Sequence, residues 1–439
     1  MHLNSKILML AMLIPCLTNR CSCNAYSQPV KWSLWDGIAL ENFSAQSIQS
    51  VQVYRTGGEL NNPVVELNNA DETLTLEFDD ITGSYIHYDY TLIHCGWDWK
   101  PSGLLFTEFA DGFEFNTIDP YGYSTGTILS YTHYNLTLPN EKVSFRISGN
   151  YILRVVDSNN HDSIVIQQRF MVVEPIISMN AMVRLPANPK LQTTSQQLEL
   201  EVLHSPLGNI DPTTDIVTLI AQNNPTHPSM RCKPTFIDRG FTRYTDPDAL
   251  VFSGGNEFRH IDLKSLHYQG QSISNIAIRD NEYHVQLAPD ESRSIQKYSD
   301  NPDINGKLIV KRDDSYDSDI EAEYVWAYFT LQVNEDVSED VYVFGELSGW
   351  TVNKGYRLNY NAVTRAYEQR ILLKQGYYNY QYAMLDGATG SFYPYVFEGD
   401  FSQTENIYLV TVYYRQPGVR YWRLVGIKTL NSRYSDKTR

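Results

Sequence analysis

Residues 377–384 read YYNYQYAM and residues 407–413 read IYLVTVY, and in both stretches bulky apolar side chains recur at every second position. Successive side chains of a strand point to opposite faces, so a period of two indicates half-buried antiparallel strands. Turn-forming residues such as TGG at 56–58 separate such stretches. The sequence therefore predicts an all-β protein of tandem β-sandwich modules, Ig-like or E-set-like in kind. The same period of two appears at residues 74–78, 143–147, 198–202, 283–287 and 324–328.

Length and composition narrow the possible classes of protein. The 439 residues correspond to roughly three domains of about 100–200 residues each. With 42% apolar and 13% aromatic residues, the chain is not disordered as a whole. Thirty-five Lys and Arg against 51 Asp and Glu give a formal net charge of −16. That balance disfavours binding to nucleic acid or to an anionic lipid surface.

The first 25 residues are expected to form a signal peptide. Lys6 precedes an apolar stretch at 7–17, ILMLAMLIPCL, which is too short to span a bilayer, and cleavage is expected near Ala25. Removing this segment takes away two basic residues and leaves a mature charge of 33 − 51 = −18. No later stretch reaches the roughly 18 apolar residues of a membrane-spanning helix. The alternative is a lipid anchor on one of three cysteines, Cys16, Cys21 or Cys23.

Two breaks in the strand pattern suggest module boundaries. Pro175 interrupts the strand predicted at 169–174, and the polar, acidic stretch KRDDSYDSDIEAE occupies residues 311–323. The predicted organisation is therefore a signal peptide at 1–25, an N-terminal sandwich at 26–175, a middle sandwich at 176–312 and a C-terminal Ig-like module at 313–439.

A G-x-S-x-G motif at residues 122–126 resembles the nucleophile elbow of hydrolases. The elbow requires a buried strand before the serine and a helix after it. Here Asp119-Pro120 precedes Ser124, and a β-branched stretch follows it. The tip of a glycine-rich loop accounts for the same motif, so Ser124 is not predicted to be catalytic.

His94 and Cys95 are adjacent and could suggest a Cys–His nucleophilic pair. Such a pair must meet in space, but neighbours on a strand point to opposite faces. Cys95 is therefore interpreted as a buried core thiol, although a disulfide with Cys232 stays open. Trp97 and Trp99 nearby are interpreted as packing residues.

An acidic run could collect a hard cation through its oxygen atoms. It lacks the glycine and glutamate spacing of an EF-hand, so a solvated linker is the favoured interpretation. Known metal and nucleotide motifs are absent from the sequence. No catalytic, cofactor-binding or metal-binding residue is predicted, and no cofactor. The run consists of Asp313, Asp314, Asp317, Asp319, Glu321 and Glu323.

The C-terminal module resembles the Ig-like carbohydrate-binding modules found beside amylase-type and glycogen-sensing proteins. The resemblance rests on VYVFGELSGW at 341–350 and GYYNYQYAMLDG at 376–387. Trp350 occupies the position of a sugar-stacking aromatic in that family, whereas Gln381 replaces a usual lysine. A shared architecture without sugar binding is the favoured interpretation.

Eight sequence blocks together resemble the plug protein of the Bacteroidetes type IX secretion system, and the resemblance as a whole covers the chain from about residue 51 to residue 428. The blocks are YRTG at 54–57, LTLEFDD at 74–80, YTLIHCGWDW at 90–99, YTHYNLTLPN at 131–140, GGNEFRHIDLKSL at 254–266, DNEYHVQLAPD at 280–290, DIEAEYV at 319–325 and LLKQGYYNYQY at 372–382.

This resemblance implies a non-enzymatic protein of the periplasm, peripherally associated with the outer membrane. Its expected partner is the large outer-membrane β-barrel translocon, whose periplasmic opening it would seal while no cargo is inside. Nucleic acid and small-molecule substrates are not expected as partners. The alternative is a periplasmic or surface glycan-binding protein that uses the C-terminal module, with Trp350 in its platform.

Overall fold

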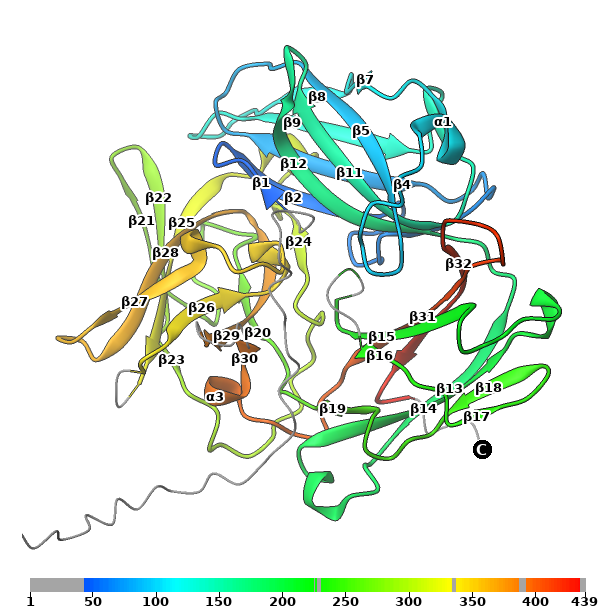
Figure 1. Cartoon of the computed structure of the whole chain (residues 1–439). Coiled ribbons are helices and arrows are strands. Elements are labelled where there is room, and N and C mark those ends of the chain that lie inside the picture. The colour runs from blue at the N-terminus through cyan, green and yellow to red at the C-terminus, as the bar shows by residue number, and fades with distance from the viewer. Residues whose placement is uncertain (1–42, 225, 227–229, 334–336, 387–391, 435–439) are drawn as a thin grey trace, which may run out of the picture.

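The computed structural model describes residues 43–224, 226, 230–333, 337–386 and 392–434. Nearly all regular structure in this part of the chain is strand, so the prediction of an all-β protein is confirmed (Figure 1). The predicted signal peptide and its three cysteines lie outside the described residues. The sheets and the cores they share group the described chain into three units, named here the first, second and third units.

The first unit is a β-sandwich whose core is rich in aromatic rings. Phe78 stacks on Tyr134 with 4.9 Å between ring centroids, and Tyr88 meets Phe78 edge-on at 5.8 Å. Such ring pairs add to the free energy gained from burial alone. The elements are β1 (Phe43–Ser44), β2 (Ile48–Arg55), β3 (Val64–Glu66), β4 (Leu74–Asp80), β5 (Tyr88–Cys95), α1 (Phe106–Phe109), β6 (Ala110–Gly112), β7 (Asn116–Thr117), β8 (Tyr121–Tyr123), β9 (Thr132–Leu138), β10 (Val143–Phe145), β11 (Gly149–Asp157) and β12 (Asn160–Val173).

Two main sheets enclose that core. One has the order β1-β12-β11-β5-β7, with β3 also paired to β12, and the other has the order β2-β4-β9-β8. A small pair, β10-β6, lies beside them. Because β4 is buried on both faces, its outer face is covered by another part of the molecule.

The second unit is a sandwich built from two separate parts of the chain. Its elements are β13 (Ser178–Arg184), η1 (Pro189–Leu191), β14 (Ser195–Leu203), η2 (Ser205–Leu207), β15 (Ile216–Gln222), β16 (Met230–Arg231), β17 (Phe236–Ile237), β18 (Phe241–Tyr244), β19 (Val251–Ser253), β31 (Ile407–Tyr414) and β32 (Arg423–Asn431). One sheet runs β13-β14-β18-β17, with β19 on β14, and the other runs β16-β15-β31-β32.

The pairing of β31 with β15 departs from the linear boundaries predicted at 176–312 and 313–439. The register runs from Ile216 opposite Tyr414 to Gln222 opposite Tyr408. Tyr408, Val410 and Val412 are fully buried in the core of the second unit. Alternation identified 407–413 as a strand, but it carries no information about which sheet the strand joins.

The third unit lies between the two parts of the second unit in the sequence. Its elements are β20 (Arg259–Asp262), β21 (Ile273–Arg279), β22 (Glu282–Leu287), β23 (Asp290–Glu291), β24 (Leu308–Val310), α2 (Ser318–Glu321), β25 (Tyr324–Gln332), β26 (Asp340–Phe344), η3 (Glu346–Ser348), η4 (Lys354–Tyr356), β27 (Arg357–Asn361), β28 (Ala366–Lys374), β29 (Gly376–Leu385), β30 (Phe392–Tyr393) and α3 (Tyr395–Glu398). The strands of this unit form one sheet in the order β20-β29-β26-β27-β28-β25-β22-β21, and β23, β24 and β30 pair with strands of this sheet.

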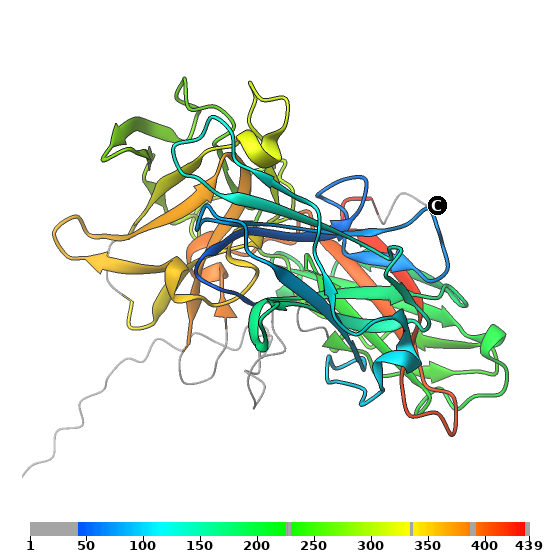
Figure 2. The same ribbon diagram turned by 90° about the horizontal axis from the view of Figure 1, so that it is seen from above.

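The first unit lies across the other two. In Figure 1 it is at the top, with the third unit on the left and the second on the right, and the view from above shows it extending over both (Figure 2). The chain crosses from the second to the third unit near Gly255 and returns near Asp400. Ser253 Oγ donates to Asp400 Oδ1 at 2.8 Å, and the Phe401 N–H donates to Gly255 O at 2.8 Å. The two crossing segments are therefore bonded to each other.

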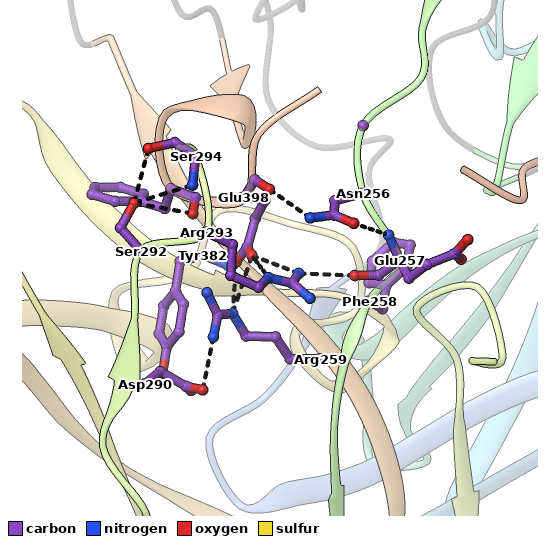
Figure 3. Close-up of polar contacts among 12 residues, drawn as sticks. Asn256, Glu257, Phe258, Arg259, Asp290, Ser292, Arg293, Ser294, Tyr382 and Glu398 are labelled. Atoms are coloured by element: carbon purple, nitrogen blue, oxygen red, sulfur yellow. Dashed lines mark hydrogen bonds and ion pairs between the residues drawn. The ribbon is translucent and has the colours of Figure 1, made fainter. Parts of the chain in front are cut away.

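A buried carboxylate anchors these crossings inside the third unit (Figure 3). Glu398 accepts hydrogen bonds from Arg259 Nε at 3.0 Å, from Arg293 Nε at 2.8 Å and from the Tyr382 N–H at 2.8 Å. Burial alone would raise the pKa of Glu398, but the two guanidinium groups hold it below its usual range. Arg259 also contacts Asp290 at 2.8 Å, so four segments meet at this point.

Substitution of Gly254 tests the tight contact between the crossing segments. A Cβ at this position would clash with the carbonyl oxygen of Phe401, so Gly254→Ala is expected to destabilise the protein by about 1–3 kcal/mol. The measurement is the midpoint of urea unfolding. Gly240→Ala is the control, because its Cβ would lie 3.5 Å from the nearest atom, Ser205 Cβ. Equal midpoints for the two variants would contradict the close approach.

Candidate functional site

A buried polar cluster lies where the first unit meets the third. It is built from two antiparallel strand pairs. In the first unit Asp79 of β4 stands directly opposite His133 of β9, and in the third unit Tyr324 of β25 stands directly opposite Lys374 of β28. Directly opposed side chains lie on the same face of a sheet. Each sheet therefore presents two polar side chains to the other.

The carboxylate of Asp79 is the centre of this cluster. Lys374 Nζ lies 2.6 Å from Asp79 Oδ2, and Tyr324 Oη donates to the same oxygen at 2.6 Å. His133 Nδ1 donates to Oδ1 at 2.8 Å. The side chains of Asp79 and Lys374 are 0% and 1% exposed. Burial alone would raise the pKa of Asp79, but the ammonium group and the imidazole ring hold it below its usual range.

The start of β25 and the segment before it complete the contact. Lys374 Nζ also donates to Asp319 O at 2.6 Å and lies 4.3 Å from the centre of the Tyr131 ring. Tyr131 Oη donates to Ala322 O at 2.8 Å. Glu323 accepts from the Leu129 N–H at 3.2 Å.

The acidic run predicted to be a solvated linker is therefore only partly solvated. Glu323 is 6% exposed and bonds to backbone N–H groups of the first unit. Asp317 caps α2, and Asp314 pairs with Arg312 at 2.8 Å. The interpretation as a simple linker is wrong for the end of the run, because that end packs into the contact between units.

A second contact joins the first unit to the second. Trp97 and Trp99 pack against an apolar cluster that includes Leu409 of β31 and Leu424 of β32. The guanidinium group of Arg169 lies 4.9 Å from the Trp99 ring centre. The interpretation of the two tryptophans as packing residues is confirmed.

Ser124 is part of a loop between two strands. Its Oγ accepts a hydrogen bond from the Tyr131 N–H at 3.0 Å, and its own N–H donates to Tyr131 O at 2.9 Å. The segment leads from β8 into β9, with no helix between them. The geometry of a nucleophile elbow is therefore not formed.

His94 and Cys95 are both buried, at 1% and 0% exposure. His94 Nε2 donates to Ser148 O at 3.3 Å, and burial lowers the pKa of His94 to about 4. Burial raises the pKa of the Cys95 thiol to about 12, which keeps it protonated and unreactive. Cys95 and Cys232 are both buried free thiols and do not form a disulfide.

Trp350 follows η3 and is partly buried against the third unit. Its ring meets Phe344 edge-on at 5.7 Å and Phe258 edge-on at 6.2 Å. Gly306 approaches the same ring so closely that a Cβ there would clash with it. An aromatic platform for sugar must present an open ring face, so this packing disfavours the glycan-binding alternative.

Comparison with known proteins places the chain in a family. The sequence profile described as "Type 9 secretion system plug protein 1st domain" matches residues 48–174, which is the first unit from β2 to the end of β12. The chain belongs to the type 9 secretion system plug protein family. No curated protein matches it.

A solved structure supports the fold over almost the whole chain. The crystal structure of a hypothetical protein from Parabacteroides merdae ATCC 43184 superposes with a TM-score of 0.86 and is 32% identical. The alignment covers 90% of this chain and 100% of that one. Escherichia coli alpha-2-macroglobulin activated by porcine elastase aligns with a TM-score of 0.18 at 11% identity, over 89% of this chain and 31% of that one.

Family membership gives a coarse functional assignment. It indicates a role associated with type IX secretion, association with the secretion translocon, and a periplasmic or outer-membrane-associated location. The family is a structural component of secretion and is not known as an enzyme. Among the described residues, no helix has the length and apolar character needed to cross a membrane.

Sequence reasoning did not single out Asp79, His133 or Lys374. A signal was present in the strand patterns. Asp79 is out of phase with Leu74, Leu76 and Phe78, so it points away from the sandwich core, yet it is fully buried. Without a known partner surface, such a charge is indistinguishable from a solvent-exposed one.

Removal of the lysine tests the buried pair. Lys374→Met leaves the Asp79 carboxylate buried without its cation, and we expect a loss of about 3–5 kcal/mol in the free energy of unfolding. The double variant Asp79→Asn/Lys374→Met removes both charges and should recover a large part of that loss. Urea unfolding measures all three proteins. A double variant that is less stable than Lys374→Met would contradict a charge-based explanation.

Proposed function

We propose that this protein is a non-enzymatic periplasmic component of type IX secretion that docks on the periplasmic opening of the outer-membrane translocon barrel and plugs it when no substrate is present. The observation that supports this proposal is the family match over residues 48–174. The chemistry-bearing motifs of the sequence, Ser124 and the His94–Cys95 pair, are packed or bonded in ways that do not suit catalysis.

The architecture suits a seal, which needs a body that keeps its shape against a rim. The first unit is joined to the third through the buried Asp79–Lys374 pair, and to the second through Trp97 and Trp99. The second and third units are joined by bonded crossing segments. The three units therefore resist separation, and their loops remain available for contacts at the surface.

The experiment that tests the proposal is affinity capture of the tagged protein from mildly solubilised native outer membranes. The expected result is co-purification of one very large β-barrel protein, identified by mass spectrometry. Its recovery should fall when a secretion substrate is trapped in the pore. Capture without any barrel, under conditions that keep the translocon intact, would overturn the proposal.

Exposed apolar side chains on the first unit are the expected contacts. Leu105, Phe113 and Tyr123 are 71%, 79% and 52% exposed in loops or at a strand end of the unit that the family profile matches. We expect Phe113→Ser combined with Tyr123→Ser to reduce barrel capture several-fold. Ile295→Ser combined with Val363→Ser is the control, because both side chains are more than 90% exposed but lie on the third unit. Equal capture by the two double variants would contradict docking through the first unit.

Charge provides a second test of docking. The chain carries a formal net charge of −16, and a basic rim on the partner would attract it over about 8 Å at physiological salt. Barrel capture should therefore weaken as ionic strength rises from low to physiological values. Capture that does not depend on salt would exclude electrostatic steering and leave apolar contacts as the source of affinity.

A further inference from the structure

Three side chains with metal-binding atoms meet beside the Asp79–Lys374 pair. They are Glu77 of β4, His133 of β9 and Asp319 of α2. One ring nitrogen of His133 and one carboxylate oxygen from each acid lie within 4.8 Å of one another. Glu77 is held in place by Asn135, whose Nδ2 donates to Glu77 Oε1 at 3.0 Å.

The imidazole of His133 is oriented for a ligand. Its Nδ1 donates to Asp79 Oδ1 at 2.8 Å, and its Nε2 is buried with no hydrogen-bond partner in the described structure. The residue is 9% exposed. A buried ring nitrogen without a partner is costly. A carboxylate that accepts from one ring nitrogen and fixes the ring, so that the other nitrogen is left to bind, is the arrangement found around metal-binding histidines.

The local charge favours a cation at this position. Burial, together with the nearby Glu77 and Asp319 carboxylates, raises the pKa of Glu59 to about 7. Lys374 lies close by, but its ammonium group is bonded to Asp79. Three carboxylates, those of Glu59, Glu77 and Asp319, therefore lie close enough to interact, and a divalent cation among them would reduce their mutual repulsion.

We propose that Glu77, His133 and Asp319 bind a divalent transition-metal ion of the Zn²⁺ type. Calcium and magnesium prefer oxygen ligands alone, whereas imidazole combined with carboxylates suits zinc. Metal–ligand bonds of about 2.0–2.2 Å require the three donors to approach somewhat closer than they lie here. Rotation of the two acidic side chains supplies that movement while Asp79 keeps the imidazole in place.

The ion would connect two units of the protein. Glu77 and His133 belong to the first unit, and Asp319 belongs to the helix that precedes β25 in the third. Metal binding would therefore stabilise the same contact that the Asp79–Lys374 pair forms, and this proposal does not depend on the role in secretion.

The test uses the full chain after dialysis against a chelator. Calorimetric titration with ZnCl₂ should give one ion per chain, and Zn²⁺ should raise the midpoint of thermal unfolding by a few degrees. Mg²⁺ at the same concentration should leave the midpoint unchanged. His133→Asn is the decisive variant, because its side-chain amide can still donate to Asp79 where Nδ1 did, but Nε2 is lost. Zn²⁺ affinity should fall roughly tenfold or more.

Asp319→Asn removes the ligand from the other unit and should weaken binding similarly. It also decides the question if His133→Asn does not fold, since Asp319 lies outside both strand pairs. His161→Asn and Asp313→Asn are the matched controls, because His161 pairs with Asp89 at the surface and Asp313 is exposed. The proposal would be overturned if His133→Asn and Asp319→Asn took up as much Zn²⁺ as the controls. It would also be overturned if the unsubstituted chain took up none.

Discussion

The buried ion pair between Asp79 and Lys374 is the constraint around which the first and third units are arranged. A charge transferred from water to a protein interior is stable only if it is paired and its remaining hydrogen-bonding capacity is used. Asp79 meets this condition only when Tyr324 and Lys374 of the third unit are in contact with it. Without this contact, the polar side chains of each sheet would be left without the partners that the other sheet provides. The two units therefore fold against each other with one relative orientation, which apolar packing alone would specify less strictly.

The sequence was sufficient to predict the fold class because alternation is a local property. The alternating stretches at 74–78, 198–202 and 407–413 all lie in strands of the structure. Pairing between distant strands is not local, so the return of β31 to the second unit could not be read from the same pattern. The resemblance of several sequence blocks identified the family, and the profile match over residues 48–174 agrees with it.

The polar contact between the units escaped prediction for a related reason. Glu77, His133 and Asp319 lie far apart in the chain. In its own segment, each could equally be an ordinary solvent-exposed residue. Asp319 stands in an acidic run that is typical of a solvated linker, and His133 stands alone in a strand. Only the tertiary structure brings their ligand atoms within 4.8 Å of one another. Trp350 shows the opposite case, since its sequence context suggested a binding platform but its ring is used in packing.

The return of the chain to the second unit has a consequence for biogenesis. The first unit is complete once residue 173 has emerged, because its strands follow one another in the sequence. The second unit must wait for β31 and β32, and until they arrive β15 lacks its central neighbour and exposes its apolar face. A chain that emerges from its N-terminus would thus hold an unfinished sheet until the whole third unit has also emerged. This interval is when chaperones and proteases would meet the exposed apolar face.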